Sequence, residues 1–165
     1  MLEYVQAESL DQTVSLLTKY GREGKILSGG TELLVSMRQR ATNPQYLVDI
    51  KRIGTLSFIE EHKDKGVKVG ALVLLRELEK SPLIIRKCAA LAEAAGEVGT
   101  FQLRNMGTIG GNICQDRKCL YYNQSHIDLF MRESLALCWT RGGKTCHAAA
   151  KVRATKQGLW RVCSA

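Results

Sequence analysis

The spacing of apolar residues near the N-terminus predicts an amphipathic helix. Leu10, Val14 and Leu17 recur at intervals that place side chains on one helical face. Ser9 precedes them as a typical N-cap, and Gln12 stands where the partner of a capping box belongs. We therefore expect a helix that starts after Ser9 and packs through these three apolar side chains.

Short apolar runs in the next sixty residues predict strands. KILS at 25–28 indicates a short buried strand, and YLVDI at 46–50 indicates a second. Between them, Thr31 is expected to cap a helix. The runs LSFIEE at 56–61 and VKVGAL at 67–72 flank the polar sequence HKDKG, which favours an antiparallel hairpin. The first seventy residues are therefore expected to alternate helix and strand.

Helices are predicted between residues 75 and 99. Leu75–Lys80 is expected to form a short helix, and Ser81 followed by Pro82 is a typical start for the next one. The apolar face of that second helix consists of Ile84, Cys88, Leu91 and Ala95. Cys88 is interpreted as a small apolar core residue. Residues 113–165 show few clear periodicities.

The composition is typical of a chain with a hydrophobic core. The protein has 165 residues, of which 45% are hydrophobic, enough for one domain or two small lobes. No apolar run approaches the roughly 20 residues that a membrane span requires. The N-terminus, MLEYVQAESLDQ, has neither the basic start nor the apolar segment of a secretory signal. We therefore expect a cytoplasmic protein without a membrane span.

The net charge of +8 is concentrated near the C-terminal end. Residues 141–165 contain six basic and no acidic side chains. Such a segment can bind nucleic acid, balance an anionic cofactor or meet an acidic partner protein. Because Trp160 is the only aromatic residue in this segment, the stacking pattern typical of nucleic-acid binding is missing. No nucleic-acid partner is therefore expected.

Two glycine pairs stand at positions suited to a close backbone approach. LSGGTELL at 27–34 is expected to run from a strand through a tight turn into a helix, which leaves N–H groups unshielded near the positive end of the helix dipole. TIGGN at 108–112 is a second pair in a strand-like context. Neither is a GxGxxG fingerprint or a P-loop, and each alone is also typical of a simple turn. Together they favour a site that holds a diphosphate from two sides.

Three motifs, in order, carry a resemblance to a known family. ILSGGTELLVSMRQR, VKVGALVLL and RNMGTIGGNIC resemble the FAD-binding subunit of the molybdenum hydroxylases, the xanthine dehydrogenase and carbon monoxide dehydrogenase medium-subunit family, over residues 1 to about 113. The resemblance implies an α+β fold in which FAD lies extended between two α/β lobes. It implies a first FAD-binding lobe at 1–55, the start of a second at 56–113, and a cysteine-rich insert at 114–165.

The family motifs also imply cofactor-binding residues. In the first turn, contacts to the FAD pyrophosphate and ribityl region would come from Leu27, Ser28, Gly29, Gly30, Thr31, Glu32 and Leu33. In the second turn they would come from Thr108, Ile109, Gly110, Gly111 and Asn112. Gly70 and Ala71 occupy a further family position near the cofactor. Because the family's flavin subunit is longer, we expect this chain to be truncated at its C-terminus and to retain FAD weakly or not at all.

Six cysteines require a separate explanation. Without a secretory signal the chain is expected in a reducing compartment, where clustered cysteines are more often metal ligands than disulfides. The last third contains five of them, with no CxxC pair: Cys114, Cys119, Cys138, Cys146 and Cys163. Their spacing alone leaves an iron–sulfur cluster, a zinc site and unligated thiols open.

One branch of the family narrows these alternatives. The β subunit of 4-hydroxybenzoyl-CoA reductase has an insert after its TIGGN motif that binds a [4Fe–4S] cluster through four cysteines. The sequences CLYYNQS, RESLALC and GGKTCH resemble that insert. The resemblance implies Cys119, Cys138 and Cys146 as cluster ligands. Cys163 would be the fourth ligand, although it follows a longer gap, and Cys114 is the alternative.

The resemblance implies an electron-transfer role. The chain would be the FAD-binding subunit of a molybdenum-containing oxidoreductase, as in aryl-CoA reductases. It would relay electrons between an external donor or acceptor, such as ferredoxin, and partner subunits that carry [2Fe–2S] and molybdopterin. One alternative is the flavin subunit of a xanthine or carbon monoxide dehydrogenase-like hydroxylase, which lacks the extra cluster and passes electrons to NAD or quinone. A zinc-binding or nucleic-acid-binding module is the other. No catalytic residue is assigned, because no acid–base pair stands out.

Overall fold

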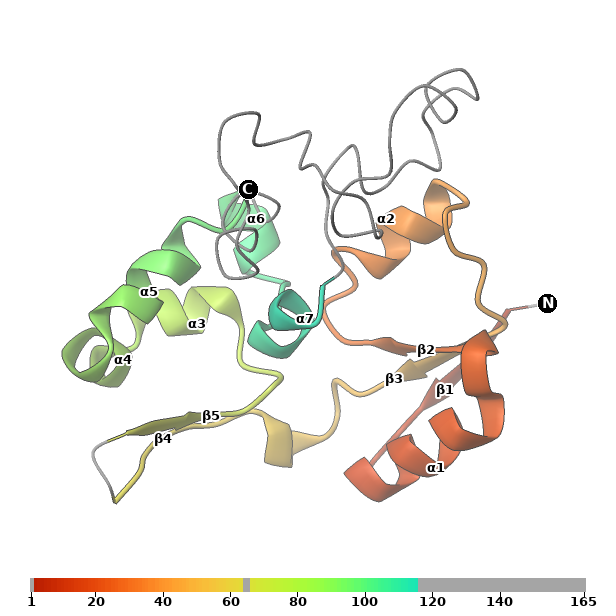
Figure 1. Ribbon diagram of the computed structural model, residues 1–165, viewed down its shortest axis with the longest axis horizontal. Helices are drawn as coiled ribbons and strands as arrows, with labels where there is room; N and C mark the ends of the chain where they lie inside the picture. The colour runs from red at the N-terminus through yellow and green to blue at the C-terminus, as the bar shows by residue number, and fades with distance from the viewer. Residues whose placement is uncertain (1, 64–65, 116–165) are drawn as a thin grey trace, which may run out of the picture. The chain divides into compact units, whose positions relative to one another are not determined.

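The computed structural model describes residues 2–63 and 66–115 (Figure 1). The chain divides into two units, Met1–Gln115 and Asp116–Ala165, and the described residues belong to the first. The elements are β1 (Glu3–Gln6), α1 (Leu10–Tyr20), η1 (Gly21–Glu23), β2 (Gly24–Leu27), α2 (Leu33–Arg38), β3 (Tyr46–Asp49), η2 (Gly54–Leu56), β4 (Ile59–Glu61), β5 (Val67–Val69), α3 (Leu75–Lys80), α4 (Pro82–Lys87), α5 (Ala89–Gly96), α6 (Phe101–Arg104) and α7 (Ile109–Ile113). This mixture of helices and strands confirms the α+β fold class. None of the helices in these two ranges has the length and apolar character needed to cross a membrane.

A three-stranded parallel sheet forms the N-terminal part of the fold. The strand order is β1-β3-β2, so β3 lies in the centre and its side chains are mostly buried. The strands expected at 46–50 and 25–28 are confirmed as β3 and β2, while β1 was not predicted. The predicted burial of the strand at 25–28 is wrong. Among the described residues β2 is an edge strand with one neighbour, and its Ile26 is 48% exposed.

Helix α1 packs on one face of this sheet (Figure 1). Its predicted start is confirmed, since Ser9 Oγ accepts a hydrogen bond from Gln12 N–H at 3.1 Å. Its predicted apolar face is confirmed at Leu17, which packs on the core, and wrong at Leu10 and Val14, which are more than half exposed. Thr13 is buried instead, with its hydroxyl donating to the Ser9 carbonyl at 2.8 Å. The side chains that pack against the core cluster of Ala7, Val48, Ile53 and Leu72 include Leu16, Leu17 and Tyr20.

The second part of the described chain joins a two-stranded hairpin to helices. β4 and β5 pair antiparallel as expected, with Ile59 opposite Val69, over a shorter length than predicted. α3 has the predicted bounds. Pro82 starts α4, and Ser81 Oγ accepts from Ile84 N–H at 3.4 Å, which confirms the predicted helix start. The core of this part consists of Val73, Leu75, Leu78, Ile84, Ala92 and Ala95.

The helix predicted after Pro82 is interrupted at Cys88. This residue has φ −150° and ψ 58°, and its N–H closes α4 on the Ile84 carbonyl at 2.7 Å. α5 then starts anew, with Leu91 N–H donating to the Cys88 carbonyl at 2.8 Å. Cys88 is exposed, so its predicted place in the core is wrong. Ile84 and Ala95 are buried as expected.

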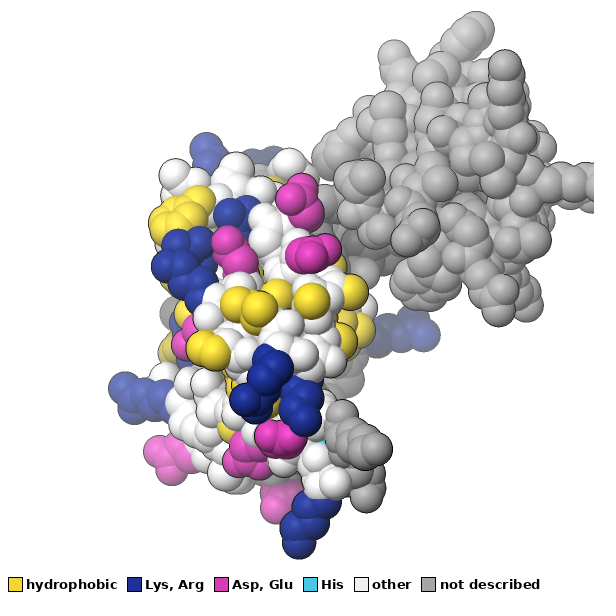
Figure 2. Space-filling view, turned by 90° about the vertical axis from the view of Figure 1, so that its left-hand side faces the viewer, with side chains coloured by type: hydrophobic (Ala, Val, Ile, Leu, Met, Phe, Trp, Pro, Cys, Tyr) yellow, Lys and Arg dark blue, Asp and Glu magenta, His cyan; other side chains and the backbone are white. Residues whose placement is uncertain are grey.

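The side of the molecule that carries α4, α5 and the β4–β5 hairpin mixes charges of both signs. Figure 2 views this side, and Lys and Arg side chains lie among Asp and Glu side chains on it. Glu61 of β4 pairs with Lys87 at 2.7 Å and with Arg86 at 3.7 Å. The hydrogen bond from Lys87 holds the pKa of the Glu61 carboxyl below its ordinary value. This side therefore lacks the uniformly basic surface typical of nucleic-acid binding.

A buried carboxylate ends the central strand of the parallel sheet. Asp49 Oδ2 accepts from the Tyr4 hydroxyl and lies 3.1 Å from Lys51 Nζ, while Oδ1 accepts from Lys51 N–H at 2.8 Å. Burial raises the pKa of Asp49. The hydrogen bonds from Tyr4 and Lys51, together with the Lys51 charge, outweigh burial, so the pKa lies below its ordinary value. The ionised form of Asp49 is therefore part of the folded state.

Replacing Tyr4 with phenylalanine is expected to lower the free energy of unfolding at neutral pH, because the hydrogen bond that Tyr4 donates to the Asp49 carboxylate is lost. A carboxylate with a lowered folded pKa stabilises the protein above its unfolded pKa of about 4 and loses this effect as pH falls through the folded pKa. The deficit of the variant should therefore shrink in acid.

Urea unfolding of both proteins between about pH 3 and about pH 7 measures this deficit. Tyr46→Phe is the matched control, because the Tyr46 ring stacks on Tyr20 with centroids 3.9 Å apart and does not contact Asp49 through its hydroxyl. A deficit for Tyr4→Phe that stays constant across this range would contradict the assignment of Asp49.

Candidate cofactor-binding site

The first glycine turn connects β2 to α2. Gly30 has a φ of 72°, in the left-handed region that favours glycine, and its carbonyl accepts from Leu34 N–H at 3.1 Å. α2 begins at Leu33, and Glu32 occupies the N-cap position without a side-chain capping bond. The prediction that Thr31 caps this helix is wrong, because the turn at Gly30 places the cap position one residue further along.

Three consecutive N–H groups of this turn have no hydrogen-bond acceptor among the residues that the structure describes. They belong to Gly29, Gly30 and Thr31. All three residues are partly exposed, so the groups are not sealed in the core. Consecutive backbone N–H groups form concave sites that suit phosphate and other anions. The first turn therefore has the donor groups that its sequence predicts.

The second glycine pair lies in helix α7 rather than in a strand-like segment. Thr108 forms an isolated bridge with Leu74 and then caps the helix that starts at the next residue. Every N–H from residue 109 to residue 112 has an internal acceptor, at 2.9–3.2 Å: the Val73 carbonyl for Ile109, the Ala71 carbonyl for Gly110, Thr108 Oγ1 for Gly111 and the Thr108 carbonyl for Asn112. The predictions that this turn lies in a strand-like context and has unshielded N–H groups are therefore wrong.

The two glycine turns are in direct contact, although eighty positions separate their hydroxyl residues. Ser28 Oγ lies 3.1 Å from Thr108 Oγ1. Gly29 lies against the backbone of Met106, and a Cβ at position 29 would stand 2.0 Å from the Met106 carbonyl oxygen. Figure 1 shows α7 beside the chain that leads from β2 into α2. Glycine at position 29 is therefore required by a backbone contact.

Two further contacts hold α7 in place. Gln115 Nε2 donates to Glu32 Oε2 at 2.8 Å and so ties the end of the α7 segment to the start of α2. A Cβ at position 110 would lie 2.8 Å from both the Cβ and the carbonyl oxygen of Ala71. The family motif that contains Gly70 and Ala71 therefore lies next to the second glycine turn.

Met106 and Gln115 belong to this site, although no motif in the sequence marks them as part of it. Met106 contributes its backbone carbonyl, and a backbone contact does not restrict the residue type at its own position. The only sign of this contact in the sequence is Gly29, the glycine that faces Met106. Gln115 contributes a side-chain amide to Glu32, a residue 83 positions away. No local pattern predicts such a pairing.

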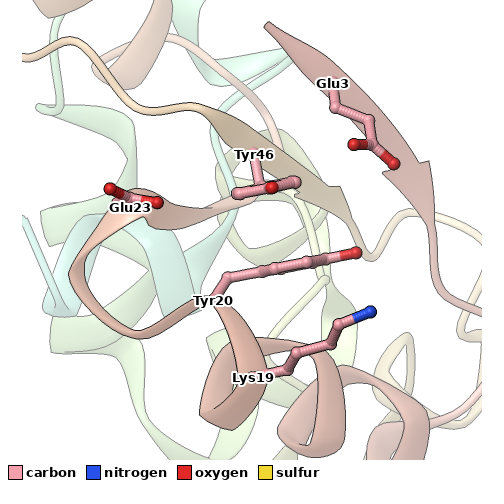
Figure 3. A pocket seen from close by; sticks show the side chains of 5 residues that line it. All are labelled: Glu3, Lys19, Tyr20, Glu23 and Tyr46. Carbon is pink, nitrogen blue, oxygen red and sulfur yellow. The ribbon is translucent and has the colours of Figure 1, made fainter.

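A separate pocket lies at the other end of the parallel sheet (Figure 3). It is lined by Glu3, Lys19, Tyr20, Glu23 and Tyr46. The Tyr20 and Tyr46 rings stack at an interplanar angle of 3°. Figure 3 shows Lys19 beside them. Glu3 and Tyr46 are the first residues of β1 and β3, whereas ligands of parallel sheets bind beyond the carboxyl ends of the strands. The first glycine turn follows the carboxyl end of β2, which makes the glycine turns the better candidate for a cofactor.

The predicted cluster ligands lie outside the described residues. These are Cys119, Cys138, Cys146 and Cys163. The alternative ligand, Cys114, is exposed directly after α7. Within 2–63 and 66–115, no group of three or more His, Cys, Asp and Glu side chains could hold a metal ion. The [4Fe–4S] cluster therefore stays a prediction.

Comparison with known proteins identifies the class to which this fold belongs. Residues 1–129 match the family described as the FAD binding domain in molybdopterin dehydrogenase. The chain belongs to this family of FAD-binding domains. The match confirms the resemblance carried by the three sequence motifs.

Individual relatives are named as subunits of dehydrogenases. The carbon monoxide dehydrogenase medium chain of Hydrogenophaga pseudoflava is 40% identical over 111 residues, and the nicotinate dehydrogenase FAD-subunit of Eubacterium barkeri is 34% identical over 112 residues. Both matches cover 67% of this chain and 38% of the relative. A solved carbon monoxide dehydrogenase structure from Hydrogenophaga pseudoflava matches with a TM-score of 0.66 and 39% identity, over 68% of this chain and 39% of that one. The chain thus spans less than two fifths of the length of these relatives.

Proposed function

We propose that this protein is the FAD-binding, electron-transfer component of a molybdenum-containing oxidoreductase. Family membership supports FAD as its cofactor. The observation that supports this particular site is the meeting of the two glycine turns, which brings three backbone N–H donors without a described acceptor to one place. Bound FAD supplies the redox chemistry itself, and the protein supplies position and electrostatics.

The residues of the site have separate tasks in this proposal. The N–H groups of Gly29, Gly30 and Thr31 would bind the diphosphate, which carries about two negative charges. Leu27, 7% exposed, and the partly buried Leu33 would anchor the turn on its flanking elements. The second-turn residues would hold the first turn in shape and close the site from the other side: Thr108, Ile109, Gly110, Gly111 and Asn112.

The proposed partners are subunits that carry molybdopterin and [2Fe–2S] centres. Relatives named as a medium chain and as an FAD-subunit support a role within a larger assembly. Electrons would pass between FAD on this chain and the metal centres of those partners. We place no substrate-binding residue on this chain.

Two versions of this function differ in the extra cluster. The cysteine segment, by its resemblance to the aryl-CoA reductase insert, favours a [4Fe–4S] cluster on Cys119, Cys138, Cys146 and Cys163, with ferredoxin as an external donor. The names of the relatives, which include carbon monoxide and nicotinate dehydrogenases, favour the version without it. Analysis of iron and zinc in anaerobically purified protein separates the two, because a cluster requires about four iron atoms per chain.

Equilibrium dialysis of the full chain against FAD tests the proposed function. We expect saturable binding at one site per chain, because the donor groups at the first turn are already in place without ligand. Lysozyme of the same concentration, measured in parallel, corrects for non-specific uptake of the flavin. The absence of saturable binding would contradict the proposal. FAD that stays bound through gel filtration would contradict only the expectation of weak retention.

A further inference from the structure

The two glycine turns differ in what they can offer an anion. In the second turn, the four N–H groups from residue 109 to residue 112 all have internal acceptors. In the first turn, the N–H groups of Gly29, Gly30 and Thr31 have none among the described residues. The polar contact that joins the two turns is the hydroxyl pair of Ser28 and Thr108, 3.1 Å apart.

The hydroxyl of Thr108 has few ways to arrange its hydrogen bonds. Thr108 is 5% exposed, and its Oγ1 accepts from Gly111 N–H at 3.2 Å. A hydroxyl has one hydrogen to donate and two lone pairs that accept. With one lone pair used by Gly111, Thr108 either donates its hydrogen to Ser28 or accepts the hydrogen of Ser28.

We infer that Thr108 is a positioning residue that acts through Ser28: it donates to Ser28 Oγ, and Ser28 in turn donates its own hydrogen to a phosphate oxygen at the first turn. This inference rests on the proposed FAD function. A phosphate oxygen can only accept, so its arrival selects the state in which Ser28 donates outward. Two hydroxyl bonds in series strengthen each other, and a hydrogen bond to an anion is stronger than a neutral one.

Gly111 has a part in this arrangement. Its N–H fixes one lone pair of Thr108, and a Cβ at position 111 would lie 3.1 Å from Thr108 Oγ1 and 3.3 Å from Ser28 Oγ. A larger residue would therefore crowd the hydroxyl pair. Thr108 and Gly111 thus contribute to phosphate binding indirectly, whereas the family resemblance alone implied direct contact.

A double-mutant cycle on the full chain tests the inference, with FAD and ADP as the probes. The variants are Ser28→Ala, Thr108→Val and the double substitution, together with Thr108→Ser, which keeps the hydroxyl. Thr100→Val is the matched control, because Thr100 Oγ1 also caps a short helix, through Leu103 N–H at 3.4 Å, without touching Ser28. Dissociation constants come from calorimetry, and urea unfolding of the unliganded variants measures their stability.

We expect Ser28→Ala to weaken FAD and ADP binding roughly tenfold, since it removes the charge-assisted bond to the phosphate. Thr108→Val should weaken binding by up to the same factor, since Ser28 then loses the hydroxyl that orients it. The double variant should bind no more weakly than Ser28→Ala, Thr108→Ser should restore binding, and Thr100→Val should leave it unchanged. Losses that add in the double variant, or an unchanged affinity of Thr108→Val, would overturn the inference alone. A wild-type chain that binds neither FAD nor ADP would overturn the proposed function and the inference with it.

Discussion

Replacement of Gly29 with alanine is expected to lower the free energy of unfolding by about 3 kcal/mol and to weaken FAD binding at least roughly 100-fold. The new Cβ would stand 2.0 Å from the Met106 carbonyl oxygen, 2.8 Å from its carbon and 3.1 Å from Gly107 Cα. All three are backbone atoms, which cannot rotate away as a side chain can. The two turns would have to separate, and the Ser28–Thr108 contact would be lost with them.

The matched control for this substitution is Gly54→Ala at the start of η2. A Cβ at position 54 would meet no heavy atom within 4 Å among the described residues, and its φ lies outside the left-handed region. Its stability should stay within about 0.5 kcal/mol of wild type. Urea unfolding and calorimetric titration with FAD measure both variants. If Gly29→Ala matched Gly54→Ala in both measurements, the contact between the two turns would not exist in solution.

Replacement of Ile84 with alanine is expected to lower the free energy of unfolding by about 3 kcal/mol and the melting temperature by roughly 10 °C or more. Ile84 is fully buried in the cluster that joins α3, α4 and α5 to the hairpin. Removing three carbons leaves a cavity that its neighbours fill only in part. Ile84 N–H and carbonyl keep their bonds to Ser81 Oγ and Cys88 N–H, so the loss reports packing rather than helix capping.

The adjacent isoleucine provides the control. Ile85 lies on the same helix and is 50% exposed, so Ile85→Ala should change the free energy of unfolding by less than about 1 kcal/mol. Thermal and urea unfolding of the full chain compare the two variants directly. Equal losses at positions 84 and 85 would mean that α4 is oriented differently from the structure.

The features predicted correctly from sequence depend on neighbours within about four positions. The Ser9 cap, the Ser81–Pro82 helix start and the bounds of α3 are of this kind. Each is decided by a hydrogen bond or a propensity inside one turn of helix, and the printed sequence contains both partners. The family motifs, in addition, correctly predicted a family of FAD-binding domains.

The features predicted wrongly depend on tertiary position. The run at 25–28 is apolar enough for a buried strand, but strand order places it at the sheet edge, where Ile26 is exposed. Leu10, Val14 and Cys88 fit a helical period, yet the orientation of each helix against its neighbours decides which side is buried. The sequence alone does not determine that rotation.

In the candidate site, too, the local features could be predicted from the sequence and the tertiary contacts could not. The two glycine pairs are recognisable because a tight turn and a close backbone approach restrict the residue type. The contact between the turns, from Ser28 to Thr108 and from Gly29 to Met106, joins segments about eighty residues apart and leaves no periodic signal. Two N–H groups of the second turn, those of Ile109 and Gly110, donate to the carbonyls of Val73 and Ala71. These acceptors come next to the turn only when the chain folds, so the sequence does not reveal them.

In the proposed function, the glycine turns hold the diphosphate of FAD. Calorimetric titration of the full chain with FAD, ADP and riboflavin tests it most directly, because ADP keeps the diphosphate without the flavin and riboflavin keeps the flavin without the diphosphate. We expect ADP to bind at one site per chain and to compete with FAD, riboflavin not to compete, and Gly29→Ala to weaken binding of both nucleotides at least roughly 100-fold. Riboflavin that displaces FAD, together with ADP that fails to bind, would contradict it.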